Sequence, residues 1–195
     1  VFEDKNGSGA TVTVKEAAAD QEQFYILVEF AAPEGTVLPE PDQVEEGFNR
    51  AVLWGGPDGR GIGFGAYRDE SCTSFIGSSE AGYAIDYVED SDPTDNKMEF
   101  IIRGHIDPMP KDAAYCLFSG IQSLCMQYQG EWVTMLDGMD IDLIVPLVGM
   151  GTHYDFQGRC GVNLNGVTLA VAENLTISPI SVSMDLVIPD GAAYD

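Results

Sequence analysis

Basic side chains are scarce in this sequence of 195 residues. Only 9 Lys and Arg stand against 32 Asp and Glu, so the formal net charge at pH 7 is −23. Nucleic-acid binding needs a basic surface that replaces the counterions of the phosphates, and an anionic membrane surface repels a protein of this charge. The composition therefore excludes nucleic acid as a partner and excludes direct adsorption to an anionic membrane.

Long apolar runs are also missing. No apolar segment approaches the roughly 18 residues that a membrane-spanning helix needs, so any membrane link lies in a segment absent from this chain. The chain opens Val1-Phe2-Glu3-Asp4 without an initiating Met, and we expect that a targeting segment has been removed from it. Apolar residues nevertheless make up 45% of the chain, which is enough to bury a core and excludes intrinsic disorder.

Known catalytic and redox motifs are absent. The sequence contains no G-x-S-x-G elbow, P-loop, H-E-x-x-H or dinucleotide fingerprint. Its four cysteines, Cys72, Cys116, Cys125 and Cys160, form no C-x-x-C unit, which disfavours a zinc ribbon or a thioredoxin-like site. They allow three full disulfide pairings, and buried free thiols are the alternative. The sequence therefore favours a protein that is not an enzyme.

Alternation of apolar and polar residues predicts β-strands along most of the chain. The segments with this period are residues 11–15, 24–30, 139–145, 167–172 and 180–188. Residues 84–88 and 98–103 flank the polar segment 89–97, and we expect them to form a β-hairpin with a long loop. Gly and Pro, 22 and 10 residues, recur between strand segments as turn formers. Roughly ten short strands separated by turns are typical of an antiparallel β-sandwich, and no long helical segment is available for a parallel α/β sheet.

The connections are less sharply defined than the strands. Residues 17–23 are expected to form a polar hairpin connection and residues 33–47 a long loop. Residues 112–128 fit either a helix or buried strands, and we favour strands. Pro146 is expected to end its strand or to place it at a sheet edge. No linker or internal repeat divides the chain, so we expect one domain over residues 1–195.

Three parts of the sequence resemble one bacterial family. They are residues 12–16 with 24–28, the Gly130-Glu131-Trp132 start of a late strand, and residues 166–182 around Ser178-Pro179. Together they resemble an extracytoplasmic domain of unknown function in membrane-anchored, anti-sigma-like proteins of Gram-positive gut bacteria. The resemblance implies an all-β fold, an Ig-like antiparallel β-sandwich with additional strands and long loops. It also implies an anchored position at the cell surface and a role in sensing, binding or protein contact, without catalytic residues.

One predicted turn has the composition of a calcium loop. In the segment Asp90 to Asn96, oxygen-bearing side chains alternate, and Asp90, Asp92 and Asp95 are the candidate ligands. The EF-hand pattern is not met, because its sixth position is Asp95 and its twelfth is Ile101. The alternative is a solvated hairpin tip built from good turn formers. A calcium-assisted adhesion or carbohydrate-binding module is therefore the second functional hypothesis.

A pair of acidic residues supports a third hypothesis. Asp140 and Asp142 are two positions apart in a predicted strand, so both project from one face, about 6.5 Å apart along the strand. Hydrolases of glycosidic bonds use two carboxylates at a similar separation. However, the alternate residues of this strand are apolar, and a solvent-facing role for the two Asp residues is the simpler interpretation.

Aromatic and histidine residues give weaker signals. Trp54, beside Gly55 and Gly56, is the candidate platform for stacking on a sugar ring, whereas Trp132 opens a strand and is expected in the core. His153 and Cys160 have the residue types of a catalytic dyad, but no family signature accompanies them. His105, near a strand end, is expected to form local hydrogen bonds. A protein or a glycan is therefore the expected partner.

Overall fold

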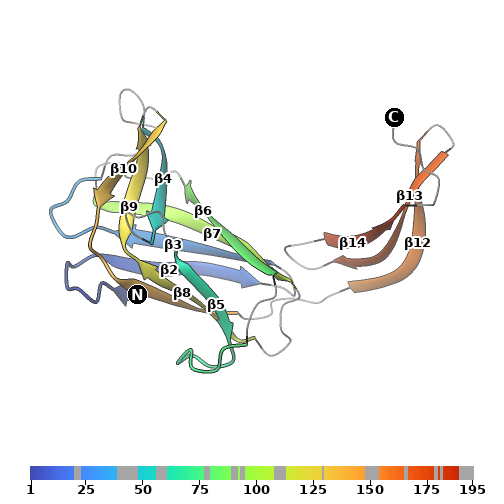
Figure 1. Cartoon of the computed structure of the whole chain (residues 1–195), viewed down its shortest axis with the longest axis horizontal. Helices are drawn as coiled ribbons and strands as arrows, with labels where there is room; N and C mark the ends of the chain where they lie inside the picture. The colour runs from blue at the N-terminus through green and yellow to red at the C-terminus, as the bar shows by residue number, and fades with distance from the viewer. Residues whose placement is uncertain are drawn as a thin grey trace. The chain divides into compact units, whose positions relative to one another are not determined.

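The structure is a computed structural model, and it describes residues 1–19, 23–38, 48–55, 61–76, 80–88, 92, 95–107, 113–128, 130–147, 154–164, 167–177, 180 and 182–188. All strand pairs in these ranges are antiparallel and no α-helix is present among them, which confirms the all-β prediction (Figure 1). The same ranges contain no helix long and apolar enough to cross a membrane. The chain divides into two compact units, residues 1–148 and 149–195, and each is described by itself.

The largest sheet of the first unit has five strands in the order β1-β2-β3-β7-β6. These strands are β1 (Phe2–Glu3), β2 (Thr11–Ala19), β3 (Gln23–Ala31), β6 (Glu80–Val88) and β7 (Lys97–Asp107). Strands β6 and β7 contain the predicted segments 84–88 and 98–103 and pair as the expected hairpin, with Ile85 opposite Ile102. The central pair of the sheet joins β3 to β7, which are distant in the sequence.

Strand β2 runs further than expected. The connection predicted over residues 17–23 is too long, because β2 continues to Ala19. The register of β2 against β3 shifts after Val14, and such a bulge places one extra residue in the strand. Inward-facing positions therefore change from Val12 and Val14 to Ala17 and Ala19, all of which lie in or against the core. Beyond the extra residue, the inward-facing side chains fall at odd instead of even positions. Alternation alone therefore could not predict the last part of this strand.

Two three-stranded sheets, β10-β9-β4 and β11-β8-β5, complete the first unit. Their strands are β4 (Phe48–Trp54), β5 (Gly63–Tyr67), β8 (Tyr115–Ile121), β9 (Ser123–Tyr128), β10 (Glu131–Leu136) and β11 (Ile141–Pro146). Only Gln122 separates β8 from β9. Its backbone N–H donates to the carbonyl of Trp54, and its carbonyl accepts from Met139, so hydrogen bonds bridge the break between the two sheets.

Two expectations about these strands are confirmed. Residues 115–121 and 123–128 are strands, as favoured for the ambiguous segment 112–128. Pro146 both ends β11 and lies in an edge strand. In β11 the buried residues alternate with partly exposed ones as the sequence indicates, so this edge strand turns one face to the core.

All three sheets contribute to one hydrophobic core. The ring of Phe118 in β8 lies 5.9 Å from the ring of Phe24 in β3 and 5.0 Å from that of Phe64 in β5, centroid to centroid. The largest fully buried side chains are Phe24, Phe30, Phe100, Phe118, Ile26, Leu53, Met98, Ile102, Ile121, Leu124 and Met126. Burial of this apolar surface is the main favourable term in folding of the unit.

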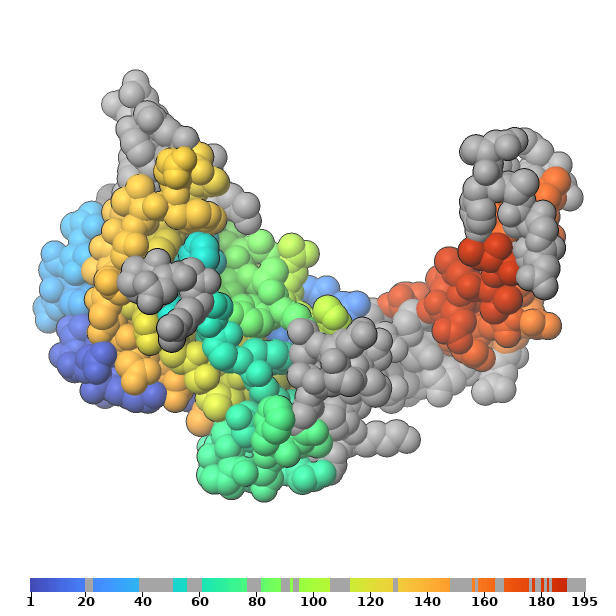
Figure 2. Space-filling view, in the orientation of Figure 1, coloured from blue at the N-terminus to red at the C-terminus, as the bar shows by residue number. Residues whose placement is uncertain are grey.

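The second unit contains one three-stranded sheet in the order β12-β13-β14. Its strands are β12 (Tyr154–Leu164), β13 (Val167–Ile177) and β14 (Val182–Val187). The alternating segments 167–172 and 180–188 predict β13 and β14. Strand β12 was not predicted, although its apolar residues Tyr154, Phe156, Cys160, Val162 and Leu164 also recur at every second position. In the space-filling view, residues of β13 and β14 (orange to red) lie at the surface (Figure 2).

Asp4 anchors the turn that follows β1. Its side chain is 6% exposed, and its carboxylate accepts hydrogen bonds from the backbone N–H groups of Asn6, Ser8 and Asp140 at 3.0, 2.9 and 2.7 Å. A hydrogen bond from the Ser8 side chain, helped by these backbone donors, holds the pKa of Asp4 well below its ordinary value. The ionised carboxylate therefore ties the first turn to the segment before β11.

We expect Asp4→Ala to destabilise the first unit by about 2 kcal/mol at pH 7, because three backbone donors lose a charged acceptor. The pKa of Asp4 is lower in the folded state than in the unfolded state, where it is near 4. The stabilisation by the ionised carboxylate is therefore complete at pH values above 4, and it is lost as the pH falls toward the folded-state pKa. Urea unfolding from pH 7 down to pH 3 measures the difference between variant and wild type. That difference should shrink below about pH 4.

The matched control is Glu131→Ala, which removes an exposed carboxylate from β10. It should change the free energy of unfolding by less than about 0.5 kcal/mol at every pH. A cost of Asp4→Ala that stays constant down to pH 3 would contradict the role assigned to the ionised carboxylate.

Candidate binding site

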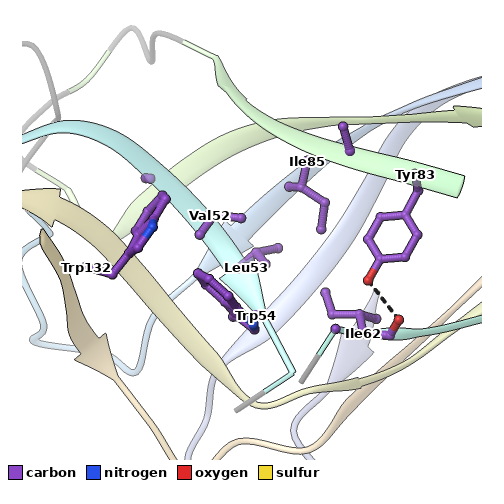
Figure 3. Close-up of a pocket in the computed structure, with 10 residues that line it drawn as sticks. Val52, Leu53, Trp54, Ile62, Tyr83, Ile85 and Trp132 are labelled. Carbon is purple, nitrogen blue, oxygen red and sulfur yellow. Dashed lines mark hydrogen bonds between the residues drawn. The ribbon is translucent and has the colours of Figure 1, made fainter. Parts of the chain in front are cut away.

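An open pocket of about 300 Å³ lies between β4 and β6. These strands are end members of two different sheets, so the pocket forms where the edge of the five-stranded sheet meets the edge of β10-β9-β4. Figure 3 shows the side chains around it. The lining residues are Ala51, Val52, Leu53, Trp54, Gly61, Ile62, Tyr83, Ala84, Ile85 and Trp132.

Two tryptophans form one wall of the pocket (Figure 3). Trp54 ends β4 and Trp132 lies in β10, and their rings pack edge to face with centroids 5.5 Å apart and planes at 83°. Trp54 is partly buried, whereas Trp132 is 41% exposed. The expectation that Trp132 lies in the core is therefore wrong. It lies in an edge strand whose first four side chains are all exposed.

Tyr83 of β6 forms another side of the pocket. Its hydroxyl donates a 2.7 Å hydrogen bond to the carbonyl oxygen of Ile62, and its ring packs edge-on against Phe118 in the core, at a centroid distance of 5.7 Å. Burial raises the pKa of Tyr83, so the hydroxyl stays protonated and keeps its hydrogen bond at physiological pH. This side of the pocket is thus fixed by the core before any ligand arrives.

The lining has the chemistry of a site for a partly apolar, uncharged ligand. None of the ten lining residues carries a charged side chain. Aromatic rings offer large apolar faces, and the backbone groups of the strand edges offer hydrogen-bond donors and acceptors. Such a combination positions a ligand by stacking and a few polar contacts. The ten described lining residues include no Ser, Cys, His, Asp, Glu or Lys side chain.

Asp140 and Asp142 lie outside this lining and share one cation. The ammonium group of Lys5 is 3.3 Å from Asp140 Oδ1 and 2.7 Å from Asp142 Oδ2. The other oxygen of Asp142 accepts a hydrogen bond from the backbone N–H of Gly120 at 3.0 Å. Asp142, and then Asp140, raise the pKa of Lys5. These contacts join the segment after β1 to the start of β11, which is a structural use of both carboxylates.

The predicted calcium loop is only partly described. Asp90 lies outside the described residues, the backbone carbonyl of Asp92 accepts a 3.4 Å hydrogen bond from the N–H of Asp95, and Asp95 Oδ1 accepts one of 2.7 Å from the N–H of Lys97. Over the part of the chain that the structure covers, no group of three or more His, Cys, Asp or Glu residues is placed to hold a metal. Calcium binding by Asp90, Asp92 and Asp95 stays a prediction.

All four cysteines are free thiols. Cys116 and Cys125 are buried, Cys72 is partly exposed and Cys160 is exposed. Burial, with a smaller contribution from Cys72, raises the pKa of Cys116 to about 12, so this thiol is not a nucleophile at physiological pH. The structure therefore agrees with the free-thiol alternative, but only two of the four thiols are buried.

The remaining sequence candidates form no described site. His153, the possible partner of Cys160, lies outside the described residues. Arg159, the neighbouring cation, donates a hydrogen bond from Nε to Glu173 Oε1 at 2.9 Å. His105 is exposed on β7, opposite Gly82 of β6.

Of the candidates named from the sequence, only the two tryptophans meet at the pocket. Trp54 was marked by the glycines that follow it. Tyr83 was missed, because nothing near it in the sequence shows that β6 lies beside β4. Comparison of the chain with protein families, curated proteins and solved structures gives no match, so the bacterial resemblance stays a prediction.

Proposed function

We propose that the first unit is a non-enzymatic binding module that takes an uncharged carbohydrate in the pocket between β4 and β6. The observation that carries this proposal is the Trp54–Trp132 pair facing an open pocket of about 300 Å³ whose described lining residues are uncharged. That volume is at the lower end of ligand pockets, which begin near ~300 Å³. It suits one or two sugar rings at the end of a longer glycan.

Stacking supplies the affinity in this proposal. The C–H face of a sugar ring is apolar and packs on an indole face, as other apolar groups do. Trp132 is 41% exposed and so has ring surface to offer. The backbone groups of Gly61 and the β6 edge lie within the lining and would orient the sugar hydroxyls. Acidic sugars are disfavoured, because the protein carries a net charge of −23 and the described lining residues include no cation.

The same proposal includes a cellular setting. We infer that the sheets of the first unit form an Ig-like sandwich in a bacterial protein anchored at the cytoplasmic membrane and exposed outside the cell. Support comes from the core shared by three antiparallel sheets and from the resemblance at residues 12–16, 130–132 and 166–182. A glycan-binding pocket suits a sensing or adhesive role at that surface.

The test uses the two tryptophans as reporters, since the chain has only two and both line the pocket. Titration of the chain with neutral oligosaccharides should change the tryptophan emission and saturate. Trp132→Ala should weaken binding about tenfold, which corresponds to roughly 1.4 kcal/mol of lost stacking. Isothermal calorimetry gives the affinity of each variant independently of fluorescence.

Phe75→Ala is the matched control. Phe75 is 59% exposed and contacts Tyr67, and it is not among the pocket residues. Binding should be unchanged in this variant. A panel of neutral oligosaccharides that leaves both emission and calorimetry unchanged would overturn the proposal, as would equal losses from Trp132→Ala and Phe75→Ala.

A further inference from the structure

A second open pocket, of about 270 Å³, lies on the outer face of the five-stranded sheet, over β3, β7 and β6. We call it the outer pocket. It faces away from the core, because the residues of β3 that line it alternate with the buried residues of that strand. Paired residues of a sheet project on the same side. Six residues line the outer pocket in two such rows: Gln23, His105 and Gly82, and then Tyr25, Arg103 and Ala84.

The outer pocket adjoins the pocket between β4 and β6. Tyr83 and Ala84 of β6 line both of them. The side chain of Tyr83 points to the inner side, where its hydroxyl bonds to Ile62 (Figure 3), whereas Ala84 is exposed on the outer side. Strand β6 is the last strand of its sheet. The two pockets are therefore neighbours on either side of a single edge strand.

A small side chain marks the crossing between the two pockets. The side chain of Ala84 is a single methyl group. Gly82 is smaller, but the ring of His105 occupies the space above it, since a Cβ atom at Gly82 would lie 3.3 Å from His105 Cε1. A chain that leaves the first pocket therefore crosses β6 over Ala84, beside the imidazole of His105.

The outer pocket offers an aromatic ring and free hydrogen-bond donors. Tyr25 is 39% exposed, and its hydroxyl donates a 3.2 Å hydrogen bond to Gln23 Oε1. Arg103 donates from Nε to Asp86 Oδ2 at 2.7 Å, and its two terminal nitrogens form no hydrogen bond with any residue that the structure describes. A ring packs on the apolar face of a sugar, and guanidinium N–H groups donate to hydroxyl oxygens.

Charge and spacing suit the same uncharged ligand as the first pocket. Arg103 is the one Lys, Arg, Asp or Glu among the described lining residues, and Asp86 balances it. Ala84, Arg103 and Tyr25 lie opposite one another on three consecutive strands. Neighbouring strands are about 4.8 Å apart, so Tyr25 lies about 10 Å from β6 across the sheet. A short oligosaccharide spans such a distance.

We propose that the outer pocket is a second subsite for the carbohydrate of the first pocket. An oligosaccharide with its end ring on Trp54 and Trp132 continues over Ala84 to Tyr25 and Arg103. This inference rests on the proposed function and makes the ligand class more specific, as an internal stretch of several sugar rings and not only a chain end. Once the first ring is bound, the contact at Tyr25 is intramolecular, so it adds affinity at little further entropy cost.

The experiment is isothermal calorimetry of the whole chain with neutral cello-oligosaccharides and N-acetylchito-oligosaccharides, from the disaccharide to the hexasaccharide. Wild type should bind the hexasaccharide of the preferred series about tenfold more tightly than its disaccharide. Tyr25→Ala should abolish this difference by weakening hexasaccharide binding about tenfold while disaccharide binding is unchanged. Arg103→Gln should act in the same direction. Trp132→Ala should weaken binding of both lengths, because both use the first pocket.

The matched control is Leu27→Ala, which shortens a side chain on the same face of β3, two residues beyond Tyr25 and outside the outer pocket. It should leave binding of both lengths unchanged. Equal affinity for the two lengths, or equal effects of Tyr25→Ala on both, would overturn the second subsite and leave the proposed function intact. If no length of either series binds, the proposed function and the second subsite fail together.

Discussion

Substitution of Gly104 by Ala should destabilise the first unit by about 3 kcal/mol or more. Gly104 lies in β7, and a Cβ atom there would collide with the carbonyl oxygen of Gly82 and with the ring of Phe24. Neither neighbour has room to yield. The carbonyl belongs to the paired strand β6, and Phe24 is fully buried in the core. Urea unfolding followed by circular dichroism measures the loss.

Gly82→Ala is the control for this prediction, since it makes the same change in the partner strand. A Cβ atom at Gly82 would meet Cε1 of His105 at 3.3 Å. His105 is exposed, so its ring can turn away, and the cost should stay below about 1 kcal/mol. Equal costs for the two alanine variants would show that β7 does not approach Phe24 as closely as described.

Phe118→Ala should cost about 3–5 kcal/mol, because it removes a fully buried ring and leaves a cavity. The ring of Phe118 contacts those of Phe24, Phe64 and Tyr83, which belong to three other strands. The loss should therefore be global, with one unfolding transition for the first unit. Tyr83 would also lose its support, so ligand affinity should fall in any preparation that still folds.

Phe75→Ala again provides the comparison, because it removes the same ring from a site 59% exposed to solvent. Its cost should be below about 1 kcal/mol. If Phe118→Ala were as mild as Phe75→Ala, the five-stranded sheet and the sheet β11-β8-β5 could not share the aromatic cluster around Phe118.

Local patterns in the sequence predicted many of the strands. Two apolar segments around a polar tip predicted the hairpin of β6 and β7. Alternation predicted the buried face of β11, because a strand with one face in the core repeats with a period of two. The end of β2 was lost at the bulge after Val14, which inverts that period. Strand β12 was also missed, although its apolar and polar residues alternate around Gly158 and Gly161.

The candidate site was much less predictable. The glycine-rich turn after Trp54 indicated that this residue lies at the surface. Trp132 was assigned to the core because aromatic residues in strands are usually buried. The deciding information was that β10 and β4 flank β9 and that β4 lies beside β6. Pairing between distant strands depends on the packing of the whole unit. The alternation within one segment therefore cannot predict which strand will lie beside it.

The order of strands in the first unit has a further consequence, for the rate at which the unit forms. Strand β3 pairs with β7, so Gln23 lies opposite His105, and β4 pairs with β9, so Val52 lies opposite Cys125. Each pairing joins strands that are far apart in the sequence, so the entropy cost of closing the long intervening loop precedes the gain from the new contacts. Folds with such high contact order reach the native state in roughly milliseconds to seconds. During synthesis on the ribosome, the edge of β3 that pairs with β7 therefore stays unpaired until β7 has emerged.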